Sequence, residues 1–271
     1  MNQSREPAVA GQFYPDEPDT LRRQVAGYLN GSPQKAVQKP RFLVVPHAGY
    51  SYSGAVAGSA YAQIKGYDYQ QVVLLGPSHH YSFLGCAATM DNRWACPVGK
   101  FAVSRPSGWG LTQARYHQPE HSLEVQLPFL HQLLPEATLF PFLCSGPLQS
   151  AASLAEQMQP LYGDENCLWV ISSDMNHVGP RFGYDPQKQG YDSGAAMDQA
   201  GLELVCAGDI KGFTSWLTGT NATICGALPI LMTMLLNQGS TDKRSINLQS
   251  YDHSASTHPS DSSVGYAALF G

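Results

Sequence analysis

Three short apolar runs in this 271-residue chain each lead into a histidine. The runs are rich in β-branched residues, as expected of strands that are buried on both faces. In open α/β sheets, ligands bind beyond the carboxyl ends of the strands. The pairs are residues 42–45 with His47, residues 72–75 with His79 and His80, and residues 168–171 with His177. The repetition predicts that imidazoles from three strands gather at one edge of a sheet, where they could hold a metal or transfer protons.

Cys225 is the other candidate metal ligand. It lies just before an apolar segment, residues 227–236, that is predicted to be a helix. The positive end of a helix dipole favours a thiolate at that place. Two imidazoles and one thiolate form a three-ligand set that leaves coordination positions open, as a catalytic metal requires. Taken singly, however, a buried cysteine is typical of an inert core thiol.

His79 and His80 are adjacent, and neighbouring residues of a strand point to opposite faces. At most one of them is therefore expected to face the same centre as His47. His121 and Glu124 fit the first turn of a helix that is predicted to start near residue 120, where acidic side chains are favoured. A functional role is equally compatible with the pattern, so the sequence leaves both roles open.

Asp174 and His177 are the candidate proton-transfer pair. They stand three residues apart after the run at 168–171, so their side chains could meet within one turn. An imidazole beside a carboxylate could exchange a proton with a ligand bound nearby. The alternative is that Asp174 only accepts hydrogen bonds from backbone amides in its own turn.

Strand-like and helix-like segments alternate along the chain, which predicts a single α/β domain over residues 1–271. Its central sheet is expected to be largely parallel or mixed, with helices on both faces. A helix is predicted from a cap at Asp19 or Thr20 to about residue 29, and a second one over residues 55–64.

The composition excludes several classes of function. The formal charge of −5 and the scattered lysines and arginines argue against nucleic-acid binding. No apolar run approaches the roughly 18 residues that span a bilayer, and residues 1–7 lack a signal-peptide pattern. The six cysteines contain no CxxC pair, which is typical of reduced cysteines in a cytoplasmic protein. There is also no phosphate-binding GxxxxGK[ST] loop, GxSxG elbow or HExxH helix.

Several short motifs, taken in order, resemble those of the Memo family. They are Pro46-His47-Ala48-Gly49-Tyr50, Gly76-Pro77-Ser78-His79-His80, Glu120-His121-Ser122-Leu123-Glu124, Ser172-Ser173-Asp174 with His177, Thr223-Ile224-Cys225-Gly226, and Asp261-Ser262-Ser263-Val264 with Tyr266-Ala267-Ala268. Because they span nearly the whole chain in the family's order, the resemblance is specific.

The resemblance implies a fold similar to that of class III extradiol dioxygenases, which are non-haem iron enzymes. It also implies a metal site of His47, His79 and Cys225, with Asp174 and His177 as the catalytic residues that line the pocket. The dioxygenases complete their iron site with a glutamate, whereas the match here is to a cysteine. Thiolate is softer and shifts the preference toward copper(I) or zinc. Iron remains the metal that the resemblance favours, with copper or zinc as alternatives.

Two functions follow from this resemblance. The first is a metal-dependent oxidoreductase that acts on a small molecule. The second is a binding module that holds a peptide or protein partner in the pocket without turnover, since animal members of the family are linked to signalling through receptor phosphopeptides. Some bacterial and archaeal members are associated with radical-SAM proteins, which implies a similar association for this chain. Nucleic acid and membrane are not expected as partners.

Overall fold

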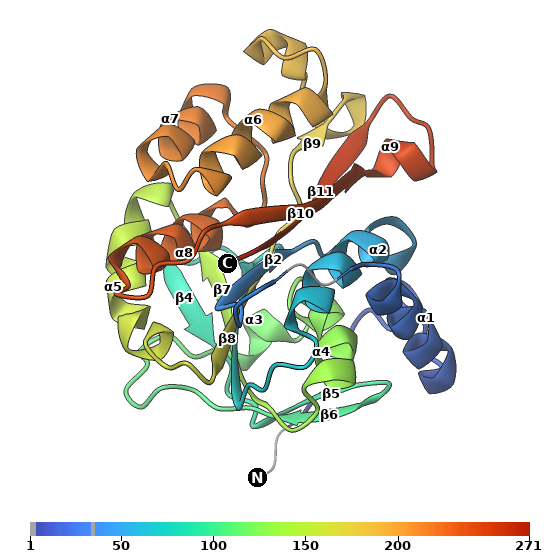
Figure 1. Cartoon of the computed structure of the whole chain (residues 1–271), viewed down its shortest axis with the longest axis vertical. Coiled ribbons are helices and arrows are strands. Elements are labelled where there is room, and N and C mark those ends of the chain that lie inside the picture. Colours follow the sequence, from blue (N-terminus) through green and yellow to red (C-terminus); the bar gives the residue numbers. More distant parts are fainter. Residues whose placement is uncertain (1–3, 34–35) are drawn as a thin grey trace.

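The computed structural model describes residues 4–33 and 36–271, so residues 1–3 of the polar N-terminal segment and residues 34–35 of a predicted loop lie outside it. The protein is a mixed α/β fold built on an eight-stranded sheet (Figure 1). The strands are β1 (Ser4–Arg5), β2 (Phe42–Val45), β3 (Gln71–Pro77), β4 (Gly85–Ala88), β5 (Arg93–Cys96), β6 (Gly99–Ala102), β7 (Thr138–Ser145), β8 (Cys167–Ser172), β9 (His177–Val178), β10 (Asn247–His253) and β11 (Ser263–Phe270). The helices are α1 (Pro18–Asn30), α2 (Tyr50–Tyr61), α3 (Ala114–His117), α4 (Leu127–Leu133), α5 (Ala151–Tyr162), α6 (Gly194–Cys206), α7 (Ile210–Thr220), α8 (Ala227–Gly239) and α9 (Ser254–Thr257).

The sheet has the order β10-β11-β2-β8-β3-β7-β4, with β9 paired to β11. The four central strands β2, β8, β3 and β7 are parallel, while β10, β11 and β4 run antiparallel to their neighbours. The sheet is therefore mixed, as predicted. Because β2, β8 and β3 are parallel, their carboxyl ends meet at one edge, and the histidine-bearing segments leave from there. A smaller sheet, β1-β5-β6, lies beside it.

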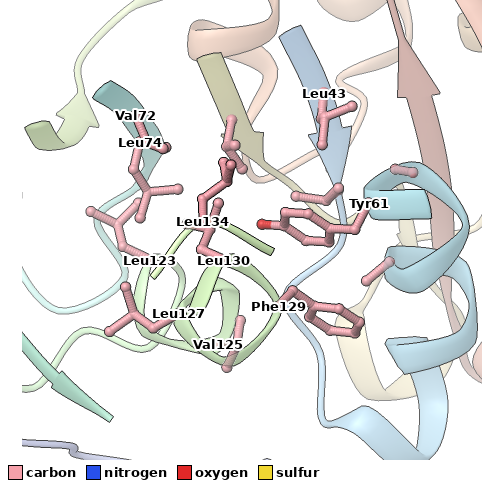
Figure 2. Close-up of a cluster of buried hydrophobic side chains, with 14 of the residues drawn as sticks. Leu43, Tyr61, Val72, Leu74, Leu123, Val125, Leu127, Phe129, Leu130 and Leu134 are labelled. Carbon is pink, nitrogen blue, oxygen red and sulfur yellow. The ribbon is translucent and has the colours of Figure 1, made fainter. Parts of the chain in front are cut away.

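Helices cover both faces of the sheet because alternate residues of each central strand point to opposite sides. Leu43 and Val45 pack with α1, α2 and α4, whereas Phe42 and Val44 pack with α5, α6, α7 and α8. Figure 1 shows these two groups of helices on either side of the strands. Figure 2 shows the core on the side of α1, α2 and α4, in which Phe129 lies next to Tyr61. The centroids of these two stacked rings are 4.9 Å apart.

Several predicted helix boundaries were wrong. Helix α1 is capped by Glu17, whose carboxylate accepts hydrogen bonds from the amides of Asp19 and Thr20, so neither predicted residue is the cap. Helix α2 begins at Tyr50 rather than at residue 55, directly after the loop that carries His47. No helix starts at Glu120, because a 3₁₀ turn at Glu124–Gln126 precedes α4.

None of the helices that the structure describes is long and apolar enough to cross a lipid bilayer.

Candidate metal centre

Three imidazoles meet at the carboxyl edge of the sheet: those of His47, His79 and His121. One potential ligand atom of each lies within 4.8 Å of the others, a grouping that could hold a metal ion. The rings of His79 and His121 are stacked at 4.7 Å, and the ring of His47 stands nearly perpendicular to both. The segments after β2 and β3 and the turn before α4 therefore supply one histidine each.

Hydrogen bonds decide which nitrogen of His47 is free. The hydroxyl of Ser172 donates to the carbonyl of Ser122 (2.6 Å) and accepts from the amide of Gln126 (2.9 Å). Since its proton is used, Ser172 Oγ can only accept from His47 Nδ1, 3.0 Å away. His47 therefore carries its proton on Nδ1 and presents Nε2 to the centre. Burial lowers the pKa of His47 to about 3, so the ring is neutral at physiological pH.

Glu120 orients the other two histidines. Its buried carboxylate accepts hydrogen bonds from the backbone amide of His79 (2.6 Å) and from His79 Nδ1 (2.9 Å). His121 Nδ1 lies 3.4 Å from the same carboxylate. Metal-binding histidines commonly donate their other ring N–H to a carboxylate in this way, which fixes the ring and raises its basicity. Burial raises the pKa of Glu120, but the bonds from His79 outweigh this and hold the pKa below its usual range.

Cys225 contacts His47, but it is not one of the three residues whose potential ligand atoms lie within 4.8 Å of one another. Its sulfur lies 3.2 Å from His47 Nε2, and the backbone amide of Asp174 donates to it at 3.3 Å. Cys225 is therefore a candidate ligand beside His47, because thiolate and imidazole are both common ligands of transition metals. The predicted thiolate is not favoured without a metal. Burial, followed by the charge of Asp174, raises the pKa of the Cys225 thiol.

The alternation argument for His79 and His80 does not apply, because β3 ends at Pro77 and both histidines lie in the bend after it. His79 is turned toward the centre by Glu120 instead. The His79 side chain is 32% exposed, and His80 is also exposed.

Asp174 and His177 lie near the centre but do not bond to each other in the way that the sequence suggested. The carboxylate of Asp174 accepts from the backbone amide of His47 at 2.7 Å, and burial raises its pKa. His177 Nδ1 lies 3.2 Å from the carbonyl of Thr223. A carbonyl only accepts, so Nδ1 carries a proton, and this bond leaves the other ring nitrogen, Nε2, unengaged. His177 is thus held as a potential proton acceptor, with Thr223 rather than Asp174 fixing its ring.

An open cleft of about 600 Å³ adjoins the centre. Its walls include His121, Asp174 and His177, together with the exposed residues Arg181 and His258. Aromatic side chains complete the lining: Phe13, Tyr52, Phe182 and Tyr266. A ligand in this cleft would contact the candidate proton-transfer residues and the third histidine together.

Glu124 contacts the N-terminal segment of the chain rather than the three histidines. Its fully buried carboxylate accepts from Arg5 Nη2 (2.7 Å), from the amides of Ala8 (2.8 Å) and Val9 (2.9 Å), and from the hydroxyl of Tyr14 (2.7 Å). It therefore anchors the N-terminal segment rather than the histidines.

By holding the N-terminal segment, Glu124 also positions one wall of the cleft indirectly. Phe13 belongs to the anchored segment, and its carbonyl accepts from the amide of Tyr50 at 2.7 Å. Its ring lies 4.8 Å from that of His121.

Sequence reasoning left His121 unassigned and overlooked Glu120, Ser172 and Gln126. An adjacent carboxylate and imidazole, Glu120-His121, was the available signal, but the pattern was interpreted as the first turn of a helix. The roles of Ser172 and Gln126 depend on contacts between distant segments, and no local pattern indicates them. The predicted ligand set of His47, His79 and Cys225 stays a prediction.

Together, the mixed sheet and the histidines at the carboxyl ends of its parallel central strands define an α/β protein with a candidate three-histidine metal centre. Residues 5–270 match the family model described as Memo-like protein, and the chain belongs to the Memo family. The chain is 31% identical to "Protein memo-1 homolog" of Caenorhabditis elegans over 254 residues, which are 85% of this chain and 70% of that protein. It is 30% identical to a MEMO1 family protein of Saccharolobus solfataricus, covering 98% of this chain and 99% of the relative. It is 29% identical to "Protein MEMO1" of Rattus norvegicus, covering 97% and 96% of the two chains.

Proposed function

We propose that this protein binds a redox-active transition metal, with iron preferred over copper and zinc, and uses it in an oxidoreductase reaction on a ligand in the cleft. The observation that carries the proposal is the convergence of three imidazoles, with the Cys225 sulfur 3.2 Å from His47 Nε2. Imidazole suits iron, copper and zinc, while a single thiolate adds a softer donor. When bound, the metal supplies Lewis-acid and electron-transfer chemistry.

The residues of the chain have distinct tasks in this proposal. His47, His79 and Cys225 hold the metal, and His121 is a further ligand or lies against the substrate. Glu120 and Ser172 keep the ligand rings in one tautomer. His177 takes a proton from the bound ligand through Nε2, since its Nδ1 proton is engaged by Thr223. Asp174 fixes the loop that carries His47 through the backbone amide.

The test is metal analysis of protein that is purified and reconstituted without oxygen. We expect about one equivalent of iron in the wild type and large losses in His47→Ala, His79→Ala and Cys225→Ala. His131→Ala, on α4 away from the cleft, is the matched control and should retain its metal. If all three ligand variants keep a full equivalent, the centre is misassigned. His177→Ala should keep its metal but lose turnover, and loss of metal would instead make His177 a ligand.

A non-catalytic binding module is the second candidate. The aromatic lining and open shape of the cleft favour it, because a peptide side chain could lie against Tyr52 and Phe182 without any reaction. Binding of a peptide by the metal-free protein, with unchanged affinity in His47→Ala, would support this candidate over the first. Association with a radical-SAM protein and a cytoplasmic location stay predictions from the family and from the cysteine content.

A further inference from the structure

Two cysteines that the metal centre does not use face each other across neighbouring strands. Cys86 on β4 and Cys144 on β7 are direct partners in the antiparallel register. Their sulfurs lie 2.9 Å apart, closer than the van der Waals contact of two sulfur atoms. Both are free cysteines, and each is only 4% exposed.

The backbone already has the geometry that a disulfide needs. Directly opposed residues of an antiparallel pair have Cα atoms about 4.5 Å or 5.5 Å apart, depending on the type of pair. Both distances lie within the range of about 4.4–6.8 Å that disulfides span. The bond could therefore form by small side-chain rotations, without a shift of either strand. We propose that Cys86 and Cys144 form a reversible disulfide.

Access to the pair comes from the edge of the sheet. Strand β4 is the last strand of the sheet order and pairs with β7, while Ala88 at its carboxyl end also forms an isolated bridge with Thr112. The indole of Trp109 covers this edge, donating to the carbonyl of Cys86 at 2.9 Å and packing against Phe142. A short edge strand opens at low cost compared with central strands, so local opening of β4 would admit a small oxidant.

The reaction is a two-step thiol–disulfide exchange with a low-molecular-weight disulfide such as oxidised glutathione. One cysteine loses its thiol proton, attacks the oxidant and displaces one glutathione thiol, which leaves a mixed disulfide. The second cysteine then loses its proton and attacks the bonded cysteine sulfur, displacing the second glutathione thiol. The two cysteines together give up two electrons and two protons, and one oxidised glutathione becomes two reduced molecules.

The pair lies close to the candidate metal centre. Cys144 is the register partner of Pro77 on β3, and its carbonyl accepts from the amide of Ser78, the residue before His79. The Cys86–Cys144 bond would therefore brace the strand next to the one that delivers His79.

The experiment equilibrates the full chain in glutathione buffers from strongly reducing to strongly oxidising. The samples are quenched with acid and alkylated, and the peptides are mapped by mass spectrometry without reduction. Equilibration starts both from reduced native protein and from protein refolded under oxidising conditions, so that slow opening of β4 cannot imitate a negative result. We expect both routes to converge on a Cys86–Cys144 peptide that dithiothreitol removes. Cys167→Ala and Cys206→Ala are the matched controls and should keep the cross-link.

A second readout is thermal unfolding. The oxidised form should melt several degrees higher than the reduced form, and Cys86→Ala should abolish this difference. The proposal is overturned if both routes converge on two alkylatable thiols under oxidising buffer while a denatured sample is fully oxidised. It is equally overturned if the cross-link joins other cysteines.

Discussion

Glu120 and Glu124 stand four residues apart, both are buried, and they stabilise different parts of the molecule. Glu120 faces the sheet edge and fixes two imidazoles, one of which is partly exposed. Glu124 faces the interior and forms an ion pair with Arg5 in which neither side chain is accessible to solvent. The comparison teaches that a buried carboxylate is not by itself evidence of chemistry: what decides is whether its partners can reach a ligand.

Loss of the Glu124 carboxylate should have the largest effect on stability. Glu124→Gln leaves the Arg5 guanidinium buried without a counter-charge, which typically costs about 3–5 kcal/mol. We expect the free energy of unfolding in urea to fall by that amount, while the folded fraction keeps its metal. Glu156→Gln, an exposed change on α5, should alter stability by less than about 0.5 kcal/mol. A Glu124→Gln protein as stable as the wild type would contradict the structural role that the comparison gives to Glu124.

Glu120→Gln should have the opposite profile. An amide cannot accept from both His79 groups and Ser122 as the carboxylate does, so the imidazoles lose their fixed orientation. Metal affinity, measured by competition with a chelator, should fall about 10–100-fold. Stability should fall by about 1–3 kcal/mol, less than for Glu124→Gln, since water can reach His79. Unchanged metal affinity together with a larger loss of stability would assign both glutamates to the framework.

The buried region around Arg5 should also make the stability of the protein depend on pH, through His117, whose carbonyl accepts a hydrogen bond from Arg5. Burial, with a further contribution from the charge of Arg5, lowers the pKa of His117 to about 3. The unfolded chain binds a proton at this histidine near its ordinary pKa of about 6.5, so the stability from neutral His117 is present above that pH and is lost as the pH falls toward 3. In His117→Gln, the slope of the unfolding free energy against pH should decrease by the amount that corresponds to about one proton between these two pH values. An unchanged slope would show that His117 does not titrate on unfolding.

The smallest effect is expected at His80. It is exposed, and it lies in the same bend as His79 without the contact to Glu120 that orients its neighbour. His80→Ala should leave metal affinity within about twofold of the wild type and stability within about 0.5 kcal/mol. Isothermal titration with the metal compares it directly with His79→Ala. Equal losses in the two variants would place His80 in the centre.

The edge of the sheet was predictable because apolar runs of β-branched residues are a local signal and parallel strands end together. His47, His79 and Cys225 came from that reasoning and from the family resemblance. The tautomer of His47 was not predictable, since it depends on a hydroxyl whose proton is directed by a residue 50 positions away. The place of His121 was missed because its acidic neighbour was interpreted as belonging to the first turn of a helix, whereas the chain there forms a turn held by Glu120.

The same physical reason explains the boundary errors. Helix α2 starts at Tyr50 because the Tyr50 amide donates to the carbonyl of Phe13 and its hydroxyl donates to that of Val125. Both partners are distant in sequence, so tertiary contacts rather than local propensity set this end. The Cys225 thiol shows the same limit, because burial and the charge of Asp174, 51 residues away, raise its pKa, and neither can be read from the local sequence.

The position of β2 also has a kinetic consequence. It pairs with β8 and β11. His47, in the loop that follows β2, contacts Asp174 and Cys225, which are 127 and 178 residues away in the sequence. Closing loops of this length is slow because their entropy is lost before the contacts form, whereas α5 and α8 need only local contacts. The site therefore exists only once the longest-range pairings of the chain have been made. If the protein binds a metal as proposed, metal uptake during refolding would report the last step of folding, and it should lag behind the recovery of the helical signal.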